Sequence, residues 1–334
     1  MAPKVSVVVP AYNVERYVAR AVRSALAQTL ADVEVIVVDD GSTDSTAAAA
    51  LAAGDDRVRV VAHGANRGPG AARNTGIEHA RGEWVGVLDA DDWFGPRRLA
   101  RLLEAAEATG ADLVADDLYL IADGASVPYA RQLRSGGVRA RAPYPIDLVP
   151  FVDSLLRGKR PMYSLLQPLI RREALLRTGL RYDEGIRLGE DIAFGIDALL
   201  AGLRFVVLPE PHYYYRQARP GALTAIDRGP FLQHFVALHD ELAGTRPLPP
   251  EARRRFLRFR AQYAELYEVW QLGQLARERG PLRALLHLAG RPRLAAALVG
   301  YLPEKLRYLY RMRYGRVAAA GEPAPRGTLE GVPA

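Results

Sequence analysis

The chain has 334 residues, of which 49% are apolar and 25% charged, and its formal net charge is +7. This composition is that of a globular protein with a sizeable core, and the length allows one large domain with an appended region. The sequence contains no cysteine, which excludes disulfides, thiol catalysis and cysteine-bound zinc. No apolar stretch reaches the ~18 residues of a membrane-spanning helix and the first residues lack a signal-peptide pattern, so we expect the protein in the cytoplasm.

The positive charge is concentrated in the C-terminal third. Residues 251–320 carry 15 Lys and Arg against 5 Asp and Glu, whereas residues 1–250 carry 29 against 31. Such a basic segment favours an anionic partner, which we expect to be a membrane surface or a phosphate-rich polymer and not nucleic acid.

Short β-rich segments alternate with helical patterns along the first 115 residues. Strands are expected at 5–9, 33–38, 57–62, 84–88 and near 112–115, and helices at 14–28, 44–53, 69–81 and 96–109. This alternation of helices with strands that are apolar on both faces predicts a mostly parallel α/β sheet flanked by helices. Further along we expect an irregular stretch at 116–160, a helix at 191–201, a last strand at 204–208, and helices from about 230 that break at Gly290 and Pro292.

Three of the expected strands are followed directly by polar segments. These segments are Pro10-Ala11-Tyr12-Asn13, Asp39-Asp40-Gly41-Ser42 and Asp89-Ala90-Asp91-Asp92. In open α/β sheets, ligands bind outside the carboxyl ends of the strands. The sequence therefore predicts one ligand site at one edge of the sheet.

The acidic cluster at 89–92 is the segment most typical of a cation site. Three carboxylates within four residues repel one another and usually need a cation or strong hydrogen bonds. Mg²⁺ and Mn²⁺ prefer carboxylate oxygen and often hold substrate phosphates as well. The alternative is a solvated acidic turn that precedes the next helix.

Four other groups of residues are candidates for the same site. One carboxylate of the Asp39–Asp40 pair could accept a hydrogen bond from a base N–H, and Arg73 in the glycine-rich segment 68–76 could meet a phosphate. Asp191, beside Glu190, opens a helix and is either a general base or a helix cap. Arg216 follows the three tyrosines 213–215 and comes after the last expected strand in the sequence. None of the six histidines shows metal-binding spacing.

Together, segments 5–13, 38–44, 71–76, 88–93 and 189–191 resemble glycosyltransferase family 2, which has the GT-A fold. The resemblance covers about residues 3–216. It implies a catalytic domain at 1–228, with a nucleotide-sugar-binding half at 1–115 and an acceptor half at 116–228. A basic helical region at 229–316 and a disordered tail at 317–334 complete the expected organisation.

The resemblance also implies roles for the site residues. The base and ribose pocket would be lined by Pro10, Ala11 and Tyr12 beside Asn13, the base of a uridine donor would be read by Asp40 (or Asp39), and Arg73 would lie by the nucleotide. The Asp-x-Asp pair for Mn²⁺ or Mg²⁺ would be Asp89 and Asp91, on either side of Ala90, with Asp91 the direct ligand. Asp92 would orient the sugar, Asp191 would be the base, and Glu190 and Arg216 would support these residues.

The implied reaction is an inverting, metal-dependent transfer from a nucleoside-diphosphate sugar to a hydroxyl of a cell-surface glycan, wall polymer or lipid-linked acceptor. The chain lacks the Gln-x-x-Arg-Trp motif of the processive synthases. It also carries Gln167-Pro168 where many relatives have a basic residue, so its acceptor contacts are expected to differ.

Two other functions compete with this interpretation. A sugar nucleotidyltransferase would show a glycine-rich first loop with Arg and Lys, and this chain has Pro10-Ala11-Tyr12-Asn13 there. A non-catalytic glycan-binding protein on the same scaffold is opposed by the intact Asp91 and Asp191.

The basic, aromatic segment 301–316 suits a helix at a membrane interface, which would place the enzyme peripherally on the inner face of the membrane. The alternative is a helix that packs on the catalytic domain with its arginines in solvent, or one that contacts a second copy in a homo-oligomer.

Overall fold

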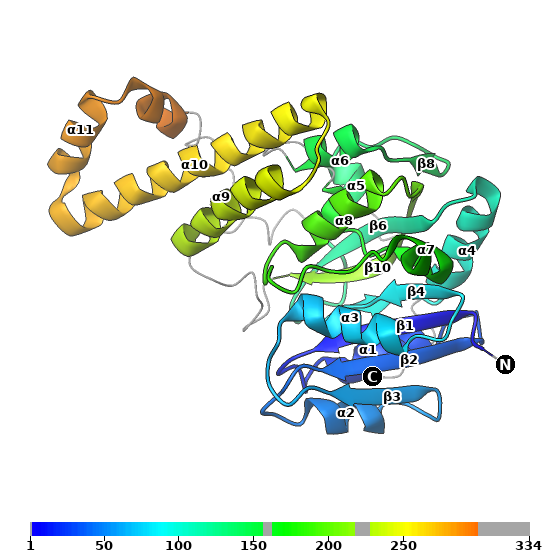
Figure 1. Cartoon of the computed structure of the whole chain (residues 1–334). Coiled ribbons are helices and arrows are strands. Elements are labelled where there is room, and N and C mark those ends of the chain that lie inside the picture. Colours follow the sequence, from blue (N-terminus) through cyan, green and yellow to red (C-terminus); the bar gives the residue numbers. More distant parts are fainter. Residues whose placement is uncertain (1, 156–161, 218–227, 300–334) are drawn as a thin grey trace. The chain divides into compact units, whose positions relative to one another are not determined.

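The computed structural model describes residues 2–155, 162–217 and 228–299 (Figure 1). These residues belong to two compact units, one with the residues up to 217 and Glu241–Phe256, the other with 228–240 and 257–299. The domain boundary expected after residue 228 stays a prediction. The segments 301–316 and 317–334 lie outside the described residues.

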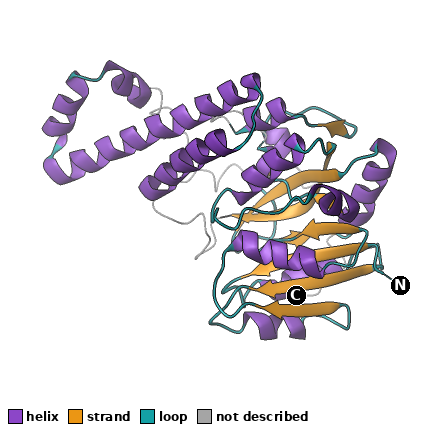
Figure 2. Ribbon diagram, in the orientation of Figure 1, coloured by secondary structure: helices purple, strands orange, loops and turns teal. Residues whose placement is uncertain are grey.

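The first unit is built on one sheet whose longer strands run in the same direction (Figures 1 and 2). β1 (Val5–Ala11) pairs in parallel with β2 (Val33–Asp39) and β4 (Trp84–Val87), and β2 pairs in parallel with β3 (Val58–Ala62). β9 (Leu169–Arg171) lies antiparallel between β4 and β6 (Leu113–Ala122), so β6 has the direction of β4.

The far half of the sheet is formed by β6 and β10 (Phe205–Gln217), which are parallel to each other. The short strands β5 (Trp93–Phe94), β7 (Ala130–Arg131) and β8 (Tyr144–Pro145) pair antiparallel with them. The strand order is β3-β2-β1-β4-β9-β6-β10-β5.

Helices on the connections cover the sheet (Figure 2). They are α1 (Val18–Leu26), α2 (Thr46–Ala52), α3 (Pro69–His79), α4 (Arg98–Thr109), α5 (Gln132–Ser135), α6 (Leu148–Ser154), α7 (Arg172–Thr178) and α8 (Glu190–Leu200), with a 3₁₀ turn at Tyr163–Leu165. The burial pattern explains these elements: α1 buries Val18, Ala21, Val22 and Ala25, which lie on one helical face, and β2 is buried along its whole length.

The C-terminal part of the chain is helical. It contains α9 (Arg228–Thr245), α10 (Pro250–Arg279) and α11 (Pro281–Ala289). Within the described ranges, no helix has both the length and the apolar character that crossing a membrane requires.

The structure corrects two of the expected element boundaries. The stretch 116–160 is not irregular throughout, because β6 continues to Ala122 and α6 lies within it. The last strand does not end at 208 but continues to Gln217, so Tyr213–Arg216 lie inside β10. The register shifts at Pro211, because proline has no N–H for the ladder, and pairing with β6 resumes at Tyr213.

Candidate active site

The polar segments that follow β1 and β2 lie side by side at one edge of the sheet. The two strands are in register up to the pair Ala11 and Asp39. Asn13 ties the two turns together, since its backbone N–H donates to Ser42 Oγ (3.0 Å) and its Oδ1 accepts the N–H of Thr43 (2.8 Å). Tyr12, next to Pro10 and Ala11, remains 45% exposed. A flat aromatic side chain is therefore available at this edge.

The two carboxylates after β2 have different surroundings. Asp39 Oδ1 accepts the N–H of Ser42 (3.0 Å). The side chain of Asp40 is buried against the N-terminus of α3, where its oxygens accept hydrogen bonds from the backbone N–H groups of Arg67 (2.9 Å) and Gly68 (2.8 Å). The partial positive charge at a helix N-terminus stabilises a carboxylate in this position.

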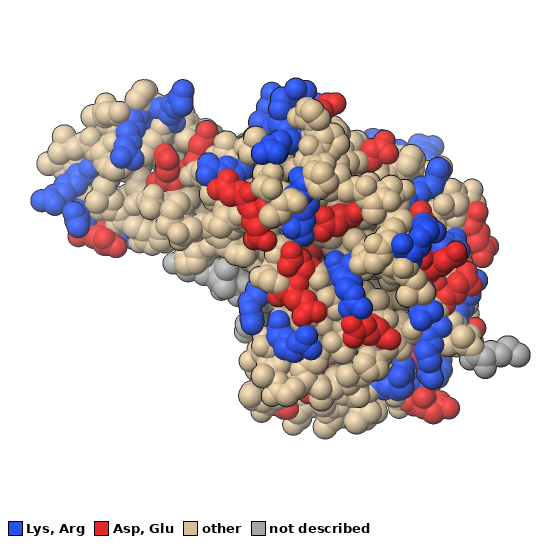
Figure 3. All heavy atoms as spheres, in the orientation of Figure 1, with Lys and Arg blue, Asp and Glu red and all other residues tan. Residues whose placement is uncertain are grey.

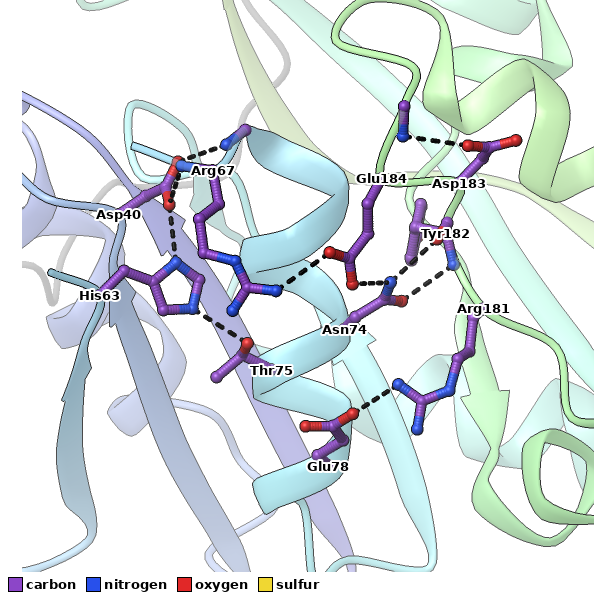
Figure 4. Close-up of polar contacts among 12 residues, drawn as sticks. Asp40, His63, Arg67, Asn74, Thr75, Glu78, Arg181, Tyr182, Asp183 and Glu184 are labelled. Atoms are coloured by element: carbon purple, nitrogen blue, oxygen red, sulfur yellow. Dashed lines mark hydrogen bonds and ion pairs between the residues drawn. The ribbon is translucent and has the colours of Figure 1, made fainter. Parts of the chain in front are cut away.

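His63 completes the surroundings of Asp40, although no histidine was a candidate from the sequence. Its Nδ1 lies 2.7 Å from Asp40 Oδ1, and its Nε2 lies 3.0 Å from Thr75 Oγ1 on α3 (Figure 4). The ring thus connects the end of β2 with the middle of α3.

The opposite side of α3 holds the segment that leads to α8 (Figure 4). Asn74 Oδ1 accepts the N–H of Tyr182 (2.9 Å), and its Nδ2 donates to the Tyr182 carbonyl (2.9 Å) and to Glu184 Oε1 (3.1 Å). At Gly70 the helix approaches so closely that a Cβ would lie 2.9 Å from the carbonyl oxygen of Asp183. One helix therefore sets the position of both the Asp40 side and the Glu190–Asp191 side of the site.

Arg73, also on α3, brings three carboxylates together. Its guanidinium is buried and donates to Asp89 Oδ1 (2.9 Å) and to Glu190, and it lies 3.5 Å from Asp191 Oδ1. These residues come from the end of β4, from α3 and from the start of α8. The structure thus unites Arg73, Asp89, Glu190 and Asp191, of which Arg73 and Glu190 are 117 residues apart in the sequence.

The shared guanidinium does not neutralise all of these carboxylates. Burial raises the pKa of Asp191 to about 8, because the nearby Glu190 and Asp89 act in the same direction and only Arg73 opposes them. Burial also raises the pKa of Asp89 despite its ion pair with Arg73. A carboxylate that exchanges its proton near neutral pH is suited to act as a general base.

β10 fixes the acidic turn at 89–92 from the other side. Asp92 is buried, and its carboxylate accepts the Tyr213 hydroxyl (2.9 Å) and the backbone N–H of Arg216 (2.7 Å). The Arg216 side chain donates through Nε to the carbonyl oxygen of Asp91 (2.8 Å). Arg216 therefore acts on the turn through its backbone and its side chain, a role that depends on its place within the strand.

The acidic turn supplies the type of ligand that Mg²⁺ and Mn²⁺ prefer, and Asp91 would hold such a cation. Both oxygens of Asp89 are engaged, one by Arg73 and one by Gln167 Nε2 (3.1 Å), and both oxygens of Asp92 are engaged by β10. Asp91 is half-buried. Among the described residues no cluster of three or more His, Asp or Glu side chains is arranged as a complete metal cage. Mg²⁺ and Mn²⁺ sites with one or two carboxylates take their remaining ligands from water and substrate phosphates.

The comparison with protein families gives a match over this part of the chain. The model of "Glycosyl transferase family 2" matches residues 6–175, which include the turns after β1, β2 and β4.

Two proteins of Rhizobium meliloti (strain 1021) are similar in sequence. The succinoglycan biosynthesis protein ExoU is 37% identical over 330 residues, which cover 96% of this chain and 91% of ExoU. The succinoglycan biosynthesis protein ExoO is 41% identical over 238 residues, which cover 71% of this chain and 66% of ExoO. The chain thus matches slightly less than two thirds of ExoO and most of ExoU.

The fold is shared with a solved glycosyltransferase structure. The mannosyltransferase PcManGT from Pyrobaculum calidifontis, in complex with GDP-Man and Mn²⁺, superposes with a TM-score of 0.56 at 20% identity, covering 94% of this chain and 84% of that one. The likeness confirms the expected GT-A fold: an open, mostly parallel sheet flanked by helices.

Proposed function

Because the chain belongs to glycosyltransferase family 2, we propose that its site transfers a sugar, with inversion, from a nucleoside-diphosphate sugar to a hydroxyl group of a cell-surface glycan, wall polymer or lipid-linked acceptor. The observation that carries the proposal is that Arg73 contacts Asp89, Glu190 and Asp191 next to the acidic turn at 89–92, which contains Asp91. That arrangement offers a cation-binding carboxylate and a base of raised pKa at one edge of the sheet.

The proposed donor lies along the ends of β1 and β2. Tyr12 offers an exposed ring to the base, and Asn13 shapes the turn beside it. A carboxylate has about four acceptor positions, of which Asp40 uses three, so one position on Oδ2 remains for the N–H of a base. Asp39 is the other carboxylate within this edge. Uridine stays our proposed base.

Asp191 is the proposed base of the transfer step. Its carboxylate takes the proton of the acceptor hydroxyl while that oxygen forms a bond to the anomeric carbon. The bond from that carbon to the phosphate oxygen breaks, and its electron pair leaves with the nucleoside diphosphate. Arg73, which Glu190 also contacts, holds Asp191 in place. A bound Mn²⁺ or Mg²⁺ at Asp91 would offset the negative charge that grows on the leaving group.

We also propose that the C-terminal helices meet an anionic membrane surface. On α11, Leu282, Leu285 and Leu286 are 62–70% exposed, and Arg283 lies among them. This combination suits the interface of a membrane that carries lipid-linked acceptors, and it would place the enzyme at the inner face of the cell membrane.

The test of the proposed activity uses the full chain, Mn²⁺ and a panel of UDP-, GDP- and dTDP-sugars, with donor binding and nucleotide release as measurements. Asp191→Asn is expected to bind the donor within about threefold of wild type and to lose roughly 100-fold or more in transfer, because the base is gone. Asp91→Ala is expected to lose the Mn²⁺-dependent part of donor affinity.

Asp56→Asn, on an exposed loop before β3, is the matched control and should behave as wild type. Normal transfer by Asp191→Asn removes the base assignment, and Mn²⁺-dependent donor affinity that survives in Asp91→Ala removes the cation site. If no nucleotide sugar binds to the wild-type chain, the transferase proposal is wrong. If a nucleotide sugar is formed from a sugar phosphate instead, the chain is a nucleotidyltransferase.

A further inference from the structure

Gln167 is a buried side chain beside the acidic turn and has no role so far in the proposed transfer. It lies two residues before β9, the strand that runs antiparallel to β4. At Gly86 of β4 an added Cβ would lie 3.3 Å from Leu169, so the two strands are closely packed. The close packing brings Gln167 next to Asp89, which follows the end of β4.

The contacts of Gln167 are polar at both ends. Its Nε2 donates to Asp89 Oδ2 (3.1 Å), which is the oxygen that Arg73 does not use. Its backbone carbonyl accepts a hydrogen bond from Arg98, which is fully buried and lies 2.8 Å from Asp116. A buried ion pair thus fixes the main chain of Gln167, and the side chain reaches from that fixed point to Asp89.

The charge of the site explains why a neutral donor is suitable at this position. Three carboxylates, those of Asp89, Glu190 and Asp191, already share the single guanidinium of Arg73. A second cation would compete with Arg73 for them, and a further carboxylate would repel Asp89. An amide supplies a hydrogen bond to Asp89 and leaves the net charge of the cluster unchanged.

We infer that Gln167 is a positioning residue for transfer: it holds Asp89 in the orientation that directs Arg73 toward Glu190 and Asp191. The inference rests on the proposed function and adds to it a residue that acts through Asp89 and Arg73 on the base. Many relatives have a basic residue in this segment. Here the segment supplies an uncharged hydrogen-bond donor instead, and the charge of the carboxylate cluster explains that difference.

The alternative is that the amide of Gln167 only satisfies its own burial. In that case its loss lowers stability and leaves the chemistry of the folded enzyme unchanged. Gln28 provides the matched control, because it is equally buried and its amide contacts only backbone groups, those of Ser24, Gly95 and Leu99.

The experiment compares Gln167→Met, Gln167→Glu and Gln28→Met in the full chain, with kcat, donor KM, donor binding in Mn²⁺ and melting temperature as measurements. Gln167→Met is expected to lower kcat about tenfold with donor KM within about threefold, because a hydrogen bond to a charged group is lost outside the donor pocket. Gln167→Glu is expected to lose more, because its charge repels Asp89. Gln28→Met should lower the melting temperature and keep kcat within about twofold.

A double-mutant cycle with Asp89→Asn tests the route of the effect. In the Asp89→Asn background, the step from Gln167 to Met is expected to cost less than about twofold, because its partner is already altered. Full kcat in Gln167→Met, or effects of the two changes that multiply, would overturn the inference while the wild-type transfer stands. A wild-type chain without nucleotide-sugar turnover would remove the proposed function and this inference together.

Discussion

Arg73 and the three carboxylates around it together hold more negative than positive charge. If Asp89, Glu190 and Asp191 were all ionised, one buried guanidinium would face three carboxylates, of which Glu190 is buried and the other two are half-buried. Burial disfavours the ionised carboxylate of Asp191, and the like charges of Glu190 and Asp89 act in the same direction, which explains why the pKa of Asp191 is raised. Keeping three carboxylates together costs free energy, and the same repulsion contributes to the raised pKa of Asp191 that suits a general base.

The pH dependence of transfer should report this arrangement. A base works in its ionised form, and the pKa of Asp191 is raised to about 8, so kcat/KM is expected to rise with pH toward that value. Glu190→Gln removes a negative charge that raises this pKa, and Asp191 no longer shares Arg73 with a charged Glu190. The rise of kcat/KM with pH should therefore move to lower pH by about one unit. The measurement is kcat/KM against pH for both proteins.

Glu78→Gln is the control for this change, since Glu78 is an exposed carboxylate of α3 that pairs with the exposed Arg181. Its profile should match that of wild type. A Glu190→Gln profile that stays in place or moves to higher pH contradicts the electrostatic account.

The sequence identified Arg73, Asp89, Asp91 and Asp191 because each belongs to a short segment with a recognisable chemistry. Tyr213 and His63 were not identified as site residues, and Gln167 was noted only for its expected effect on acceptor contacts, because each acts on a partner 23 to 124 residues away. Arg216 was identified, but as a residue behind the strand. Its backbone bond to Asp92 requires the strand to continue past Pro211.

At the scale of elements, α3 connects the parts of the site. Asp40 and His63 hold one side of the helix, and the segment 182–184 packs on the other (Figure 4). The alternation of strands and helices predicted this helix and its approximate bounds. It could not predict the docking of segment 182–184, which depends on a glycine contact between distant parts of the chain.

Gly70→Ala should therefore disturb both stability and transfer. Its Cβ would lie 2.9 Å from the backbone oxygen of Asp183, so α3 or the segment 182–184 must move. We expect a loss of about 1–3 kcal/mol in the free energy of unfolding, measured by denaturant titration, and a lower kcat, because Arg73 follows α3. Gly244→Ala is the matched control, because Gly244 is also helical and nothing lies within 4 Å of its added Cβ.

The control should be neutral or stabilising by up to about 1 kcal/mol, since alanine favours helix over glycine. If Gly70→Ala is as stable and as active as Gly244→Ala, then the close contact between α3 and segment 182–184 does not constrain the site.

At the scale of the whole molecule, the net positive charge of the chain comes from its C-terminal third. Arginines are spread over the α10–α11 part of the chain, as Figure 3 shows. α11 also carries exposed leucines, and a helix with exposed leucines and arginines lowers its free energy when the leucines enter a bilayer and the arginines meet anionic headgroups. The sequence predicted a membrane contact for 301–316, and the exposed face of α11 extends that proposal to described residues.

The paired substitution Leu285→Glu and Leu286→Glu tests this surface in the full chain. Wild type is expected to cosediment with vesicles that contain anionic phosphatidylglycerol, more weakly in high salt, and only weakly with neutral phosphatidylcholine vesicles. Burial of one leucine contributes about 1.5–3 kcal/mol, so the double variant should bind at least tenfold more weakly.

Leu176→Glu on α7, where Leu176 is equally exposed at 68%, is the matched control and should bind as wild type. Equal binding by the double variant and wild type, or equal binding to neutral vesicles, contradicts a membrane role for α11 and leaves the transfer chemistry of the first unit untouched.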